Sequence, residues 1–285
     1  LVIGNTLKAD TLIVEQGILQ GGEVGNRHQY PSLVILNGGS LKDPDDIYSY
    51  STTAANIVVS EGKTATWILD SRCDYQGKLL GSGELTVNVT SVRCNMQGDW
   101  SQFAGTLKFV KTKTGSYDPL IQWNNSYGLG NATVVGDFDN GGKDVTIGTL
   151  TGAVAISGSG RTTVKNMDLK VRKARGGSND NNISIEGALI VSNSITLTHS
   201  GNALVNGETL KLWTAKSFQA TDNLVITLPE LPEGLYWDTT HLLTKEGTLK
   251  VTDTPTGIEE RSIDCRSQDI YDLQGRKLSA PKKGI

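Results

Sequence analysis

The chain reads Arg72-Cys73-Asp74-Tyr75-Gln76-Gly77, and 21 residues later it reads Arg93-Cys94-Asn95-Met96-Gln97-Gly98. A second pair follows at a shift of 22, where Gly83-Glu84-Leu85-Thr86-Val87 returns as Gly105-Thr106-Leu107-Lys108-Phe109. Repeats of about 20–50 residues are typical of solenoid proteins. Helical repeats of this length would need apolar residues at a 3.6-residue period and few glycines, and this stretch has neither.

The repeat predicts an all-β fold, a right-handed parallel β-helix in which the two stretches are adjacent coils. Equivalent residues of adjacent coils would then lie about 4.8 Å apart. Short apolar runs closed by Gly, Ser or Asn recur along residues 1–252, for example Leu33-Val34-Ile35-Leu36 before Gly38. Over that range we expect about eleven or twelve coils in a stack of roughly 50–60 Å.

The composition suits such a fold and excludes some functions. The 285 residues include 33 glycines, and 37% of the residues are hydrophobic. A net charge of −3 gives no general attraction to nucleic acid, so we expect no nucleic-acid partner. No apolar run reaches the roughly 18–20 residues of a membrane span, so we expect none.

The sequence pattern changes near residue 224. Pro229 and Pro232 stand where a ladder would need backbone donors, and Trp237 follows them. We interpret residues 224–252 as a cap on the β-helix, with Trp237 over its apolar interior, because an open sheet edge would pair with other chains. Residues 253–262 are expected to be a linker. Residues 263–285 are expected to start a truncated β-sandwich.

Parts of the chain resemble known families. Ile147–Gly152 and Leu228–Thr239 resemble autotransporter-associated β-strand repeat proteins. Gly83–Val87 together with Asp99–Gly105 is similar to coils of secreted parallel β-helix proteins of Bacteroidetes. The tail Ile270–Leu278 resembles the start of a type IX secretion C-terminal sorting domain. These resemblances imply a secreted or cell-surface bacterial protein that meets the secretion machinery through its C-terminal segment, and they imply no catalytic residue.

One acidic turn is a candidate calcium site. Asp137, Asp139 and Asp144 lie in Asp137-Phe138-Asp139-Asn140-Gly141-Gly142-Lys143-Asp144, and carboxylate oxygens on a glycine turn are ligands that calcium prefers. The spacing differs from an EF-hand loop, because Asn140 and Gly141 each come one place early. An exposed acidic turn between strands is the alternative, and no other cofactor is expected.

Aromatic side chains gather in the first half of the chain and suggest a polysaccharide or host glycan as partner. Trp100, Trp123 and Tyr127 are the candidates for stacking on sugar rings, with Trp123 and Tyr127 on either side of Asn124 and Asn125. The alternative is that these rings are buried, where each Å² of apolar surface stabilises the fold by about 25 cal/mol.

The repeated pair suggests a second kind of site. Arg72 and Arg93 would stack on adjacent coils, as would Asp74 and Asn95, with Asp99 close by in sequence. A polysaccharide lyase needs a base near an acidic carbon proton of the sugar and acids that hold calcium. A structural polar ladder is the alternative, because Asn95 stands where a second acid would be needed.

The same register places Cys73 beside Cys94, with Cα atoms about 5 Å apart. That separation permits a disulfide, but parallel Cβ directions make its torsion difficult to reach. We predict two stacked, inward-facing thiols, with a formed bridge as the alternative.

Two functions follow from these observations. The first is a non-catalytic secreted or cell-surface β-solenoid that acts as stalk, adhesin or scaffold and contacts glycans. The alternative is a carbohydrate-active β-helix, a pectate-lyase-like polysaccharide lyase or its C-terminal portion. The two are distinguished by whether Arg72, Asp74, Arg93, Asp99 and Trp123 meet in one groove.

Overall fold

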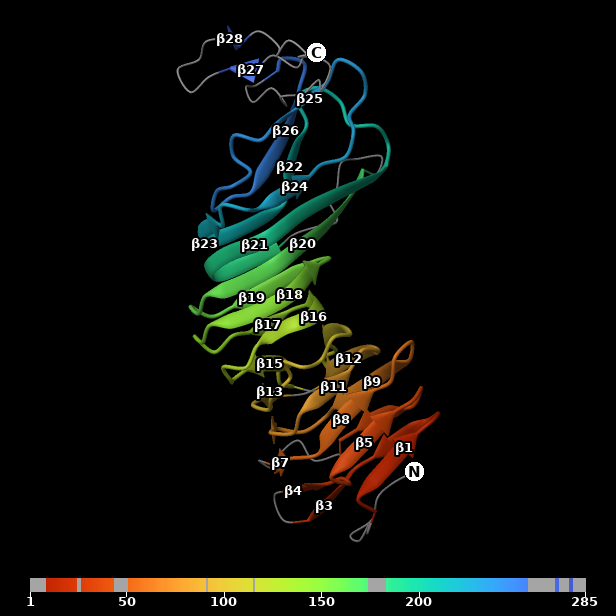
Figure 1. The fold of residues 1–285 in the computed structure, drawn as a ribbon. Coiled ribbons are helices and arrows are strands. Elements are labelled where there is room, and N and C mark those ends of the chain that lie inside the picture. The colour runs from red at the N-terminus through yellow and green to blue at the C-terminus, as the bar shows by residue number, and fades with distance from the viewer. Residues whose placement is uncertain are drawn as a thin grey trace, which may run out of the picture.

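Stacked β-strands make up the molecule, which is elongated along the stack (Figure 1). The computed structural model describes residues 9–24, 27–43, 51–90, 92–114, 116–173 and 183–255, together with the backbone of 270–271 and 277–278. Within these ranges every regular element is a strand, and most strand pairs are parallel. The expected all-β parallel β-helix is confirmed.

The described strands of the stack form three ladders, called faces below, and the first is limited to the N-terminal coils. The first face has four strands: β1 (Thr11–Val14), β5 (Leu33–Leu36), β8 (Asn56–Val59) and β11 (Leu79–Gly81). The second face carries β2 (Ile18–Gln20), β6 (Ser40–Lys42), β9 (Thr64–Leu69), β12 (Glu84–Val89), β14 (Thr106–Lys111), β16 (Leu129–Gly136), β18 (Val145–Thr151), β20 (Thr162–Lys173), the second part of β21 (Ile183–Gly201) and β24 (Val225–Thr227).

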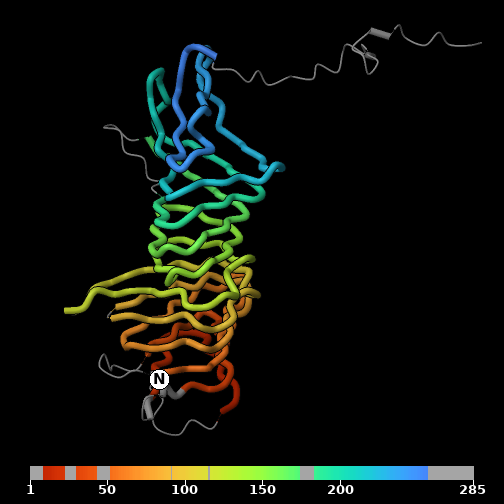
Figure 2. Tube along the Cα trace, turned by 90° about the vertical axis from the view of Figure 1, so that its left-hand side faces the viewer, coloured from red at the N-terminus to blue at the C-terminus, as the bar shows by residue number. Residues whose placement is uncertain are grey.

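The third face begins with β4 (Arg27–Gln29), which also pairs antiparallel with β3 (Gly22–Val24). It continues through β7 (Ser51–Thr53), β10 (Cys73–Tyr75), β13 (Arg93–Met96), β15 (Leu120–Trp123), β17 (Phe138–Asp139), β19 (Val154–Ser157), the first part of β21 and β23 (Trp213–Ala220). Figure 2 shows the successive coils, and the yellow segment between β14 and β15 extends away from them.

Alternation along each strand builds the core. In β12 the side chains of Leu85, Val87 and Val89 are buried, while the residues between them are half-buried on the outside. Leu85 is in register with Leu107 of the next coil, and Val87 with Phe109. Because successive strand residues face opposite sides, each coil adds one layer of apolar side chains to a continuous interior.

Glycines are required at the corners of the coils for steric reasons. A Cβ atom on Gly98 would overlap the carbonyl oxygen of Gly77 in the coil below, and one on Gly105 would overlap the carbonyl oxygen of Gly83. The sequence repeat therefore includes these glycines because neighbouring backbones approach each other too closely for a side chain.

Within the described residues the number of coils is lower than expected. The second face holds ten described strands, whose nine steps of about 4.8 Å correspond to a height of about 43 Å. The prediction of eleven or twelve coils was wrong because the coils differ in length and the chain leaves the parallel ladder after Thr227. Register partners are only 16 residues apart at Thr133 and Thr149. They are 31 apart at Ser194 and Val225.

An antiparallel sheet follows the last coils. It consists of β22 (Thr209–Lys211), β26 (Thr248–Thr252) and β25 (Tyr236–Asp238) in that order. The indole of Trp213 is fully buried against Gly247, stacks on Phe218 at 5.3 Å between ring centroids, and donates its N–H to the carbonyl oxygen of Thr244. Trp213 therefore covers the core at this end, whereas Trp237, the expected lid, is only partly buried.

The expected sorting segment lies mostly outside the described residues. Of residues 263–285, the structure describes the backbone of β27 (Ile270–Tyr271) and β28 (Lys277–Leu278), which pair antiparallel. Of the expected linker, 253–255 are described and exposed, and 256–262 lie outside the description.

Candidate functional site

The outer side of the third face brings together part of the lyase candidate. Asp74 is in register with Asn95, and the Asn95 amide donates a hydrogen bond of 2.5 Å to the Asp74 carboxylate. The same register, continued by one residue, places Arg72 next to Arg93. Two arginines, an acid and a buried amide thus lie on the outward side of the chain from Arg72 through β10 and of β13.

The other two members of the lyase candidate lie elsewhere. Asp99 follows the Gly98 corner, where its carboxylate accepts hydrogen bonds from the backbone N–H of Ser101 at 3.0 Å and its hydroxyl at 2.6 Å. These hydrogen bonds lower the pKa of Asp99 below its ordinary value. Trp123 points into the core and is fully buried. The five candidates therefore do not line one groove.

The aromatic residues proposed to bind glycans are mostly interior. Trp100 is 1% exposed and Trp123 0%, and the two rings meet edge to face at 5.5 Å between centroids. Trp67 continues this column, 6.3 Å from Trp100 and 4.5 Å from Tyr75. Neither Trp100 nor Trp123 can stack on a sugar without unfolding its coil, so their assignment as glycan platforms is corrected to core packing.

Tyr127 differs from the two tryptophans, because 57% of its surface is exposed. It follows the buried Asn125, whose side-chain amide donates to the carbonyl oxygen of Met96 at 2.8 Å and whose side-chain oxygen accepts from the Tyr127 N–H at 2.9 Å. Asn125 therefore fixes the turn that presents the Tyr127 ring to solvent.

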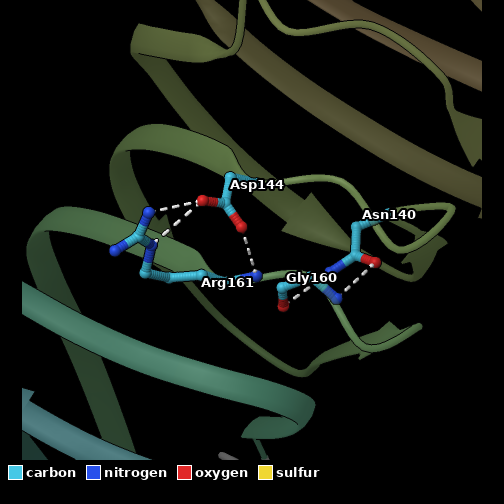
Figure 3. Close-up of polar contacts among 4 residues, drawn as sticks. All are labelled: Asn140, Asp144, Gly160 and Arg161. Atoms are coloured by element: carbon cyan, nitrogen blue, oxygen red, sulfur yellow. Dashed lines mark hydrogen bonds and ion pairs between the residues drawn. The ribbon is translucent and has the colours of Figure 1, made fainter.

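Each acid of the candidate calcium turn has its own hydrogen-bond or ion-pair partner, and Figure 3 shows Asp144 with Arg161. The Asp139 carboxylate accepts from the Gly141 N–H at 2.5 Å, and the Asp137 carboxylate accepts from the Ala155 N–H at 2.7 Å. Asp144 forms an ion pair of 2.5 Å with Arg161 and accepts the Arg161 backbone N–H at 2.9 Å. These bonds from Arg161 lower the pKa of Asp144.

The centre of this turn is an asparagine rather than an acid. Asn140 is fully buried; its amide donates to the carbonyl oxygen of Gly160 at 3.0 Å. Its side-chain oxygen accepts the N–H groups of Gly142 at 2.9 Å and Gly160 at 3.3 Å. The turn thus connects one coil to the next. Among the described residues, no three His, Cys, Asp or Glu side chains form a metal-binding group.

The two cysteines occupy the predicted positions. Cys73 is in register with Cys94, and both are fully buried thiols that are not joined by a disulfide. Burial, followed by the negative charge of Asp43, raises the pKa of the Cys94 thiol well above its ordinary value. A neutral thiol in this position packs as a small apolar group.

A buried carboxyl group was missed in the sequence. Asp43 precedes Pro44 and two further acids, a composition that is typical of an exposed loop. In the structure Asp43 is fully buried and accepts hydrogen bonds from the hydroxyl groups of Tyr30 and Tyr75. The available signal was alternation: Leu41 points inward and Lys42 outward, so Asp43 points inward again.

A shallow polar groove was also missed. It has a volume of about 340 Å³ and crosses several coils at the corner before the second face. Its lining includes the register partners Thr64, Glu84, Thr106 and Thr133, with Gly83 and Gly105 between them. Glu84 is paired with Lys108 at 2.7 Å, so the groove presents hydroxyl groups and backbone rather than an unpaired acid.

Comparisons with known proteins identify no relative of this chain. No protein-family model matches the chain, and neither the curated proteins nor the solved structures give a significant match. The described part of the chain contains no helix with the length and apolar character of a membrane span.

Proposed function

We propose that this chain is a non-catalytic β-solenoid, secreted or displayed at the cell surface, which acts as a stalk, adhesin or scaffold. The observation that carries the proposal is the use of polar side chains to join one coil to the next. Asp74 binds Asn95, Glu84 binds Lys108, and Asp144 binds Arg161, each across one coil step.

Two further pairs extend the same pattern. Gln76 donates to Gln97 at 3.3 Å, and Ser194 donates to Asn166 at 3.0 Å. A catalytic site needs groups that converge on a reacting atom and are held ready for it. Side chains that bind the equivalent position of the next coil instead stabilise a regular stack, which suits a structural element.

Glycan contact is included in the proposal as a surface property. The exposed ring of Tyr127 and the hydroxyl-lined groove at Gly83 and Gly105 are the surfaces that could meet an extended sugar chain. Export to the cell surface, and contact with the secretion machinery through the C-terminal segment, rest on the family resemblances of the sequence.

The alternative of a polysaccharide lyase retains one observation, the grouping of Arg72, Asp74 and Arg93 on adjacent coils. The deciding experiment incubates the protein with uronate-containing polysaccharides, with and without calcium, and follows the absorbance of unsaturated products. We expect no product. Product that disappears in both Arg72→Ala and Arg93→Ala would establish the lyase and overturn the structural role.

Binding is tested separately on an array of neutral and acidic glycans. We expect any retained glycan to bind Tyr127→Ala more weakly than the parent protein, while Tyr117→Ala, which removes another exposed tyrosine, serves as the matched control. Equal loss in both variants would mean that the ring of Tyr127 has no specific role.

A further inference from the structure

The buried carboxyl group of Asp43 lies where three coils of the solenoid meet. Asp43 follows β6, and its backbone N–H donates to the carbonyl oxygen of Ile68 at 2.9 Å. Tyr75 reaches it from β10, and Tyr30 reaches it from the segment before β5. Movement of this side chain would therefore affect the contacts of all three coils.

The contacts of Tyr30 are compatible with a protonated Asp43, and the Lys42 carbonyl oxygen also accepts the Gly21 N–H at 2.9 Å. The Tyr30 hydroxyl lies 3.0 Å from a carboxyl oxygen of Asp43 and 2.9 Å from the carbonyl oxygen of Lys42. A hydroxyl has one proton to donate, so it cannot serve both acceptors together. If Asp43 is protonated, it can donate to the Tyr30 oxygen while Tyr30 donates to Lys42 and Tyr75 donates to the other carboxyl oxygen.

The surroundings favour that neutral form. The titratable groups that face Asp43 from the described elements around it are Tyr30, Asp70 at the end of β9, Cys73 and Tyr75 of β10, and Cys94 of β13. Burial of a carboxylate is costly, and the charge of Asp70 adds to that cost. Burial is the main cause that raises the pKa of Asp43 from 3.8 to about 7, against the opposing side-chain contacts of Tyr75, Tyr30 and Trp67, which favour the charged form.

We propose that Asp43 is a proton-dependent latch of the N-terminal coils, closed when its buried carboxyl group holds a proton and loosened when the proton is lost. This inference goes beyond the proposed structural role, because it assigns a condition under which one part of the stack opens. The tyrosines remain neutral throughout, since burial, followed by the charge of Asp43, raises the pKa of both Tyr30 and Tyr75.

The direction of the pH dependence follows from the proton balance. Between pH 3.8 and about 7 the closed coils bind a proton that the opened coils, with Asp43 in water, have released. The closed form is therefore most stable below this window and loses stability as the pH rises through it. One proton gives at most about a tenfold change in the opening equilibrium per pH unit, or about a thousandfold across the window.

Hydrogen exchange tests the latch in the full chain. The backbone amides of Asp43 and Gln76, which bond to Ile68 and to Thr53, report on the affected coils. Their opening constants, corrected for the intrinsic effect of pH on exchange, are measured from pH 4.5 to 7.5. We expect them to rise by up to about tenfold per unit in the parent protein. They should stay nearly constant in Asp43→Asn, while the control Glu61→Gln, which changes an exposed acid in the turn between β8 and β9, follows the parent.

A direct measurement keeps the proposal testable if Asp43→Asn does not fold. Infrared spectra of the parent protein with isotope-labelled aspartate should show the carbonyl band of a buried protonated carboxyl group that disappears near pH 7. In Tyr75→Phe that midpoint should move to higher pH, because a hydrogen bond that stabilises the charged form is lost. Absence of such a band at pH 5, or identical pH profiles of exchange in the parent and Asp43→Asn, would overturn the latch.

Discussion

Replacement of Asn140 by alanine should destabilise the solenoid far more than neutralisation of the neighbouring Asp144. Both side chains connect the same two coils, and both are drawn in Figure 3. Asn140 is fully buried and satisfies the N–H and the carbonyl oxygen of Gly160, which is itself buried. Asn140→Ala leaves these two groups without that partner and opens a small cavity.

The magnitude follows from those two groups. A buried backbone group that loses its partner costs about 1–3 kcal/mol, so the variant should lose roughly 2–6 kcal/mol of stability. Asp144→Asn keeps the acceptor for the Arg161 N–H and removes a charge from an ion pair whose side chains are 55% and 60% exposed. An exposed pair of this kind contributes little, and salt screens it.

Urea unfolding, followed by tryptophan fluorescence, compares the two variants with the parent protein at neutral pH. The same series is repeated with added calcium. We expect a large shift of the midpoint in Asn140→Ala, a small one in Asp144→Asn, and no change of either with calcium. Equal losses in the two variants, or stabilisation by calcium that Asp139→Asn abolishes, would refute the interpretation of this turn as a hydrogen-bonded corner.

Three further outcomes are expected. Gly98→Ala should lower the melting temperature, because the new Cβ would overlap the Gly77 carbonyl oxygen and prevent normal packing of the corner. Gly130→Ala should leave the melting temperature nearly unchanged, because the nearest atoms lie 3.6 Å from its new Cβ. Equal effects of the two variants would contradict the steric explanation. Trp123→Ala should lower the free energy of unfolding, measured with urea, by about 3–5 kcal/mol, whereas Tyr127→Ala should change it little. The reverse order would place Trp123 at the surface. Peptide-resolved labelling with a maleimide at pH 6, below the pKa of about 7 of Asp43, should modify Cys73 and Cys94 only after unfolding, because both are buried and the pKa of the Cys94 thiol is raised. Rapid labelling of the native protein at that pH would show that the coils open there.

The register of the coils was predictable because the same spacing of about 21–22 residues recurs at several pairs of identical residues. The pairs Gly77–Gly98 and Gly83–Gly105 repeat because a Cβ does not fit, and Cys73 and Cys94 repeat four residues before the first of these pairs. The number of coils was not predictable in the same way. Loops outside the ladder differ in length from coil to coil, and neither the core nor the corner glycines restrict them.

The candidate site was less predictable, although part of the signal was present. In the run from Leu120 to Trp123, Ile121 points inward, so alternation also directs Trp123 into the core. The same reasoning applies to Asp43 after Leu41, but the acids and Pro44 that follow it suggested an exposed loop. Composition indicates which side chains usually face water. The alternation of inward and outward positions along a strand decides which polar or aromatic residues depart from that rule.

The direction of the backbone hydrogen bonds has a mechanical consequence. In this stack the bonds between coils run along the long axis, while the strands lie across it. A pulling force applied to the two ends would therefore load the coils in series, and the bonds of the weakest coil would break before those of the others. A coil such as the one between Thr11 and Leu33, 22 residues apart in register, would release roughly 70 Å of extended chain. We expect such a rod to lengthen in separate steps under tension, so that each opened coil absorbs work before the attachment at either end is lost.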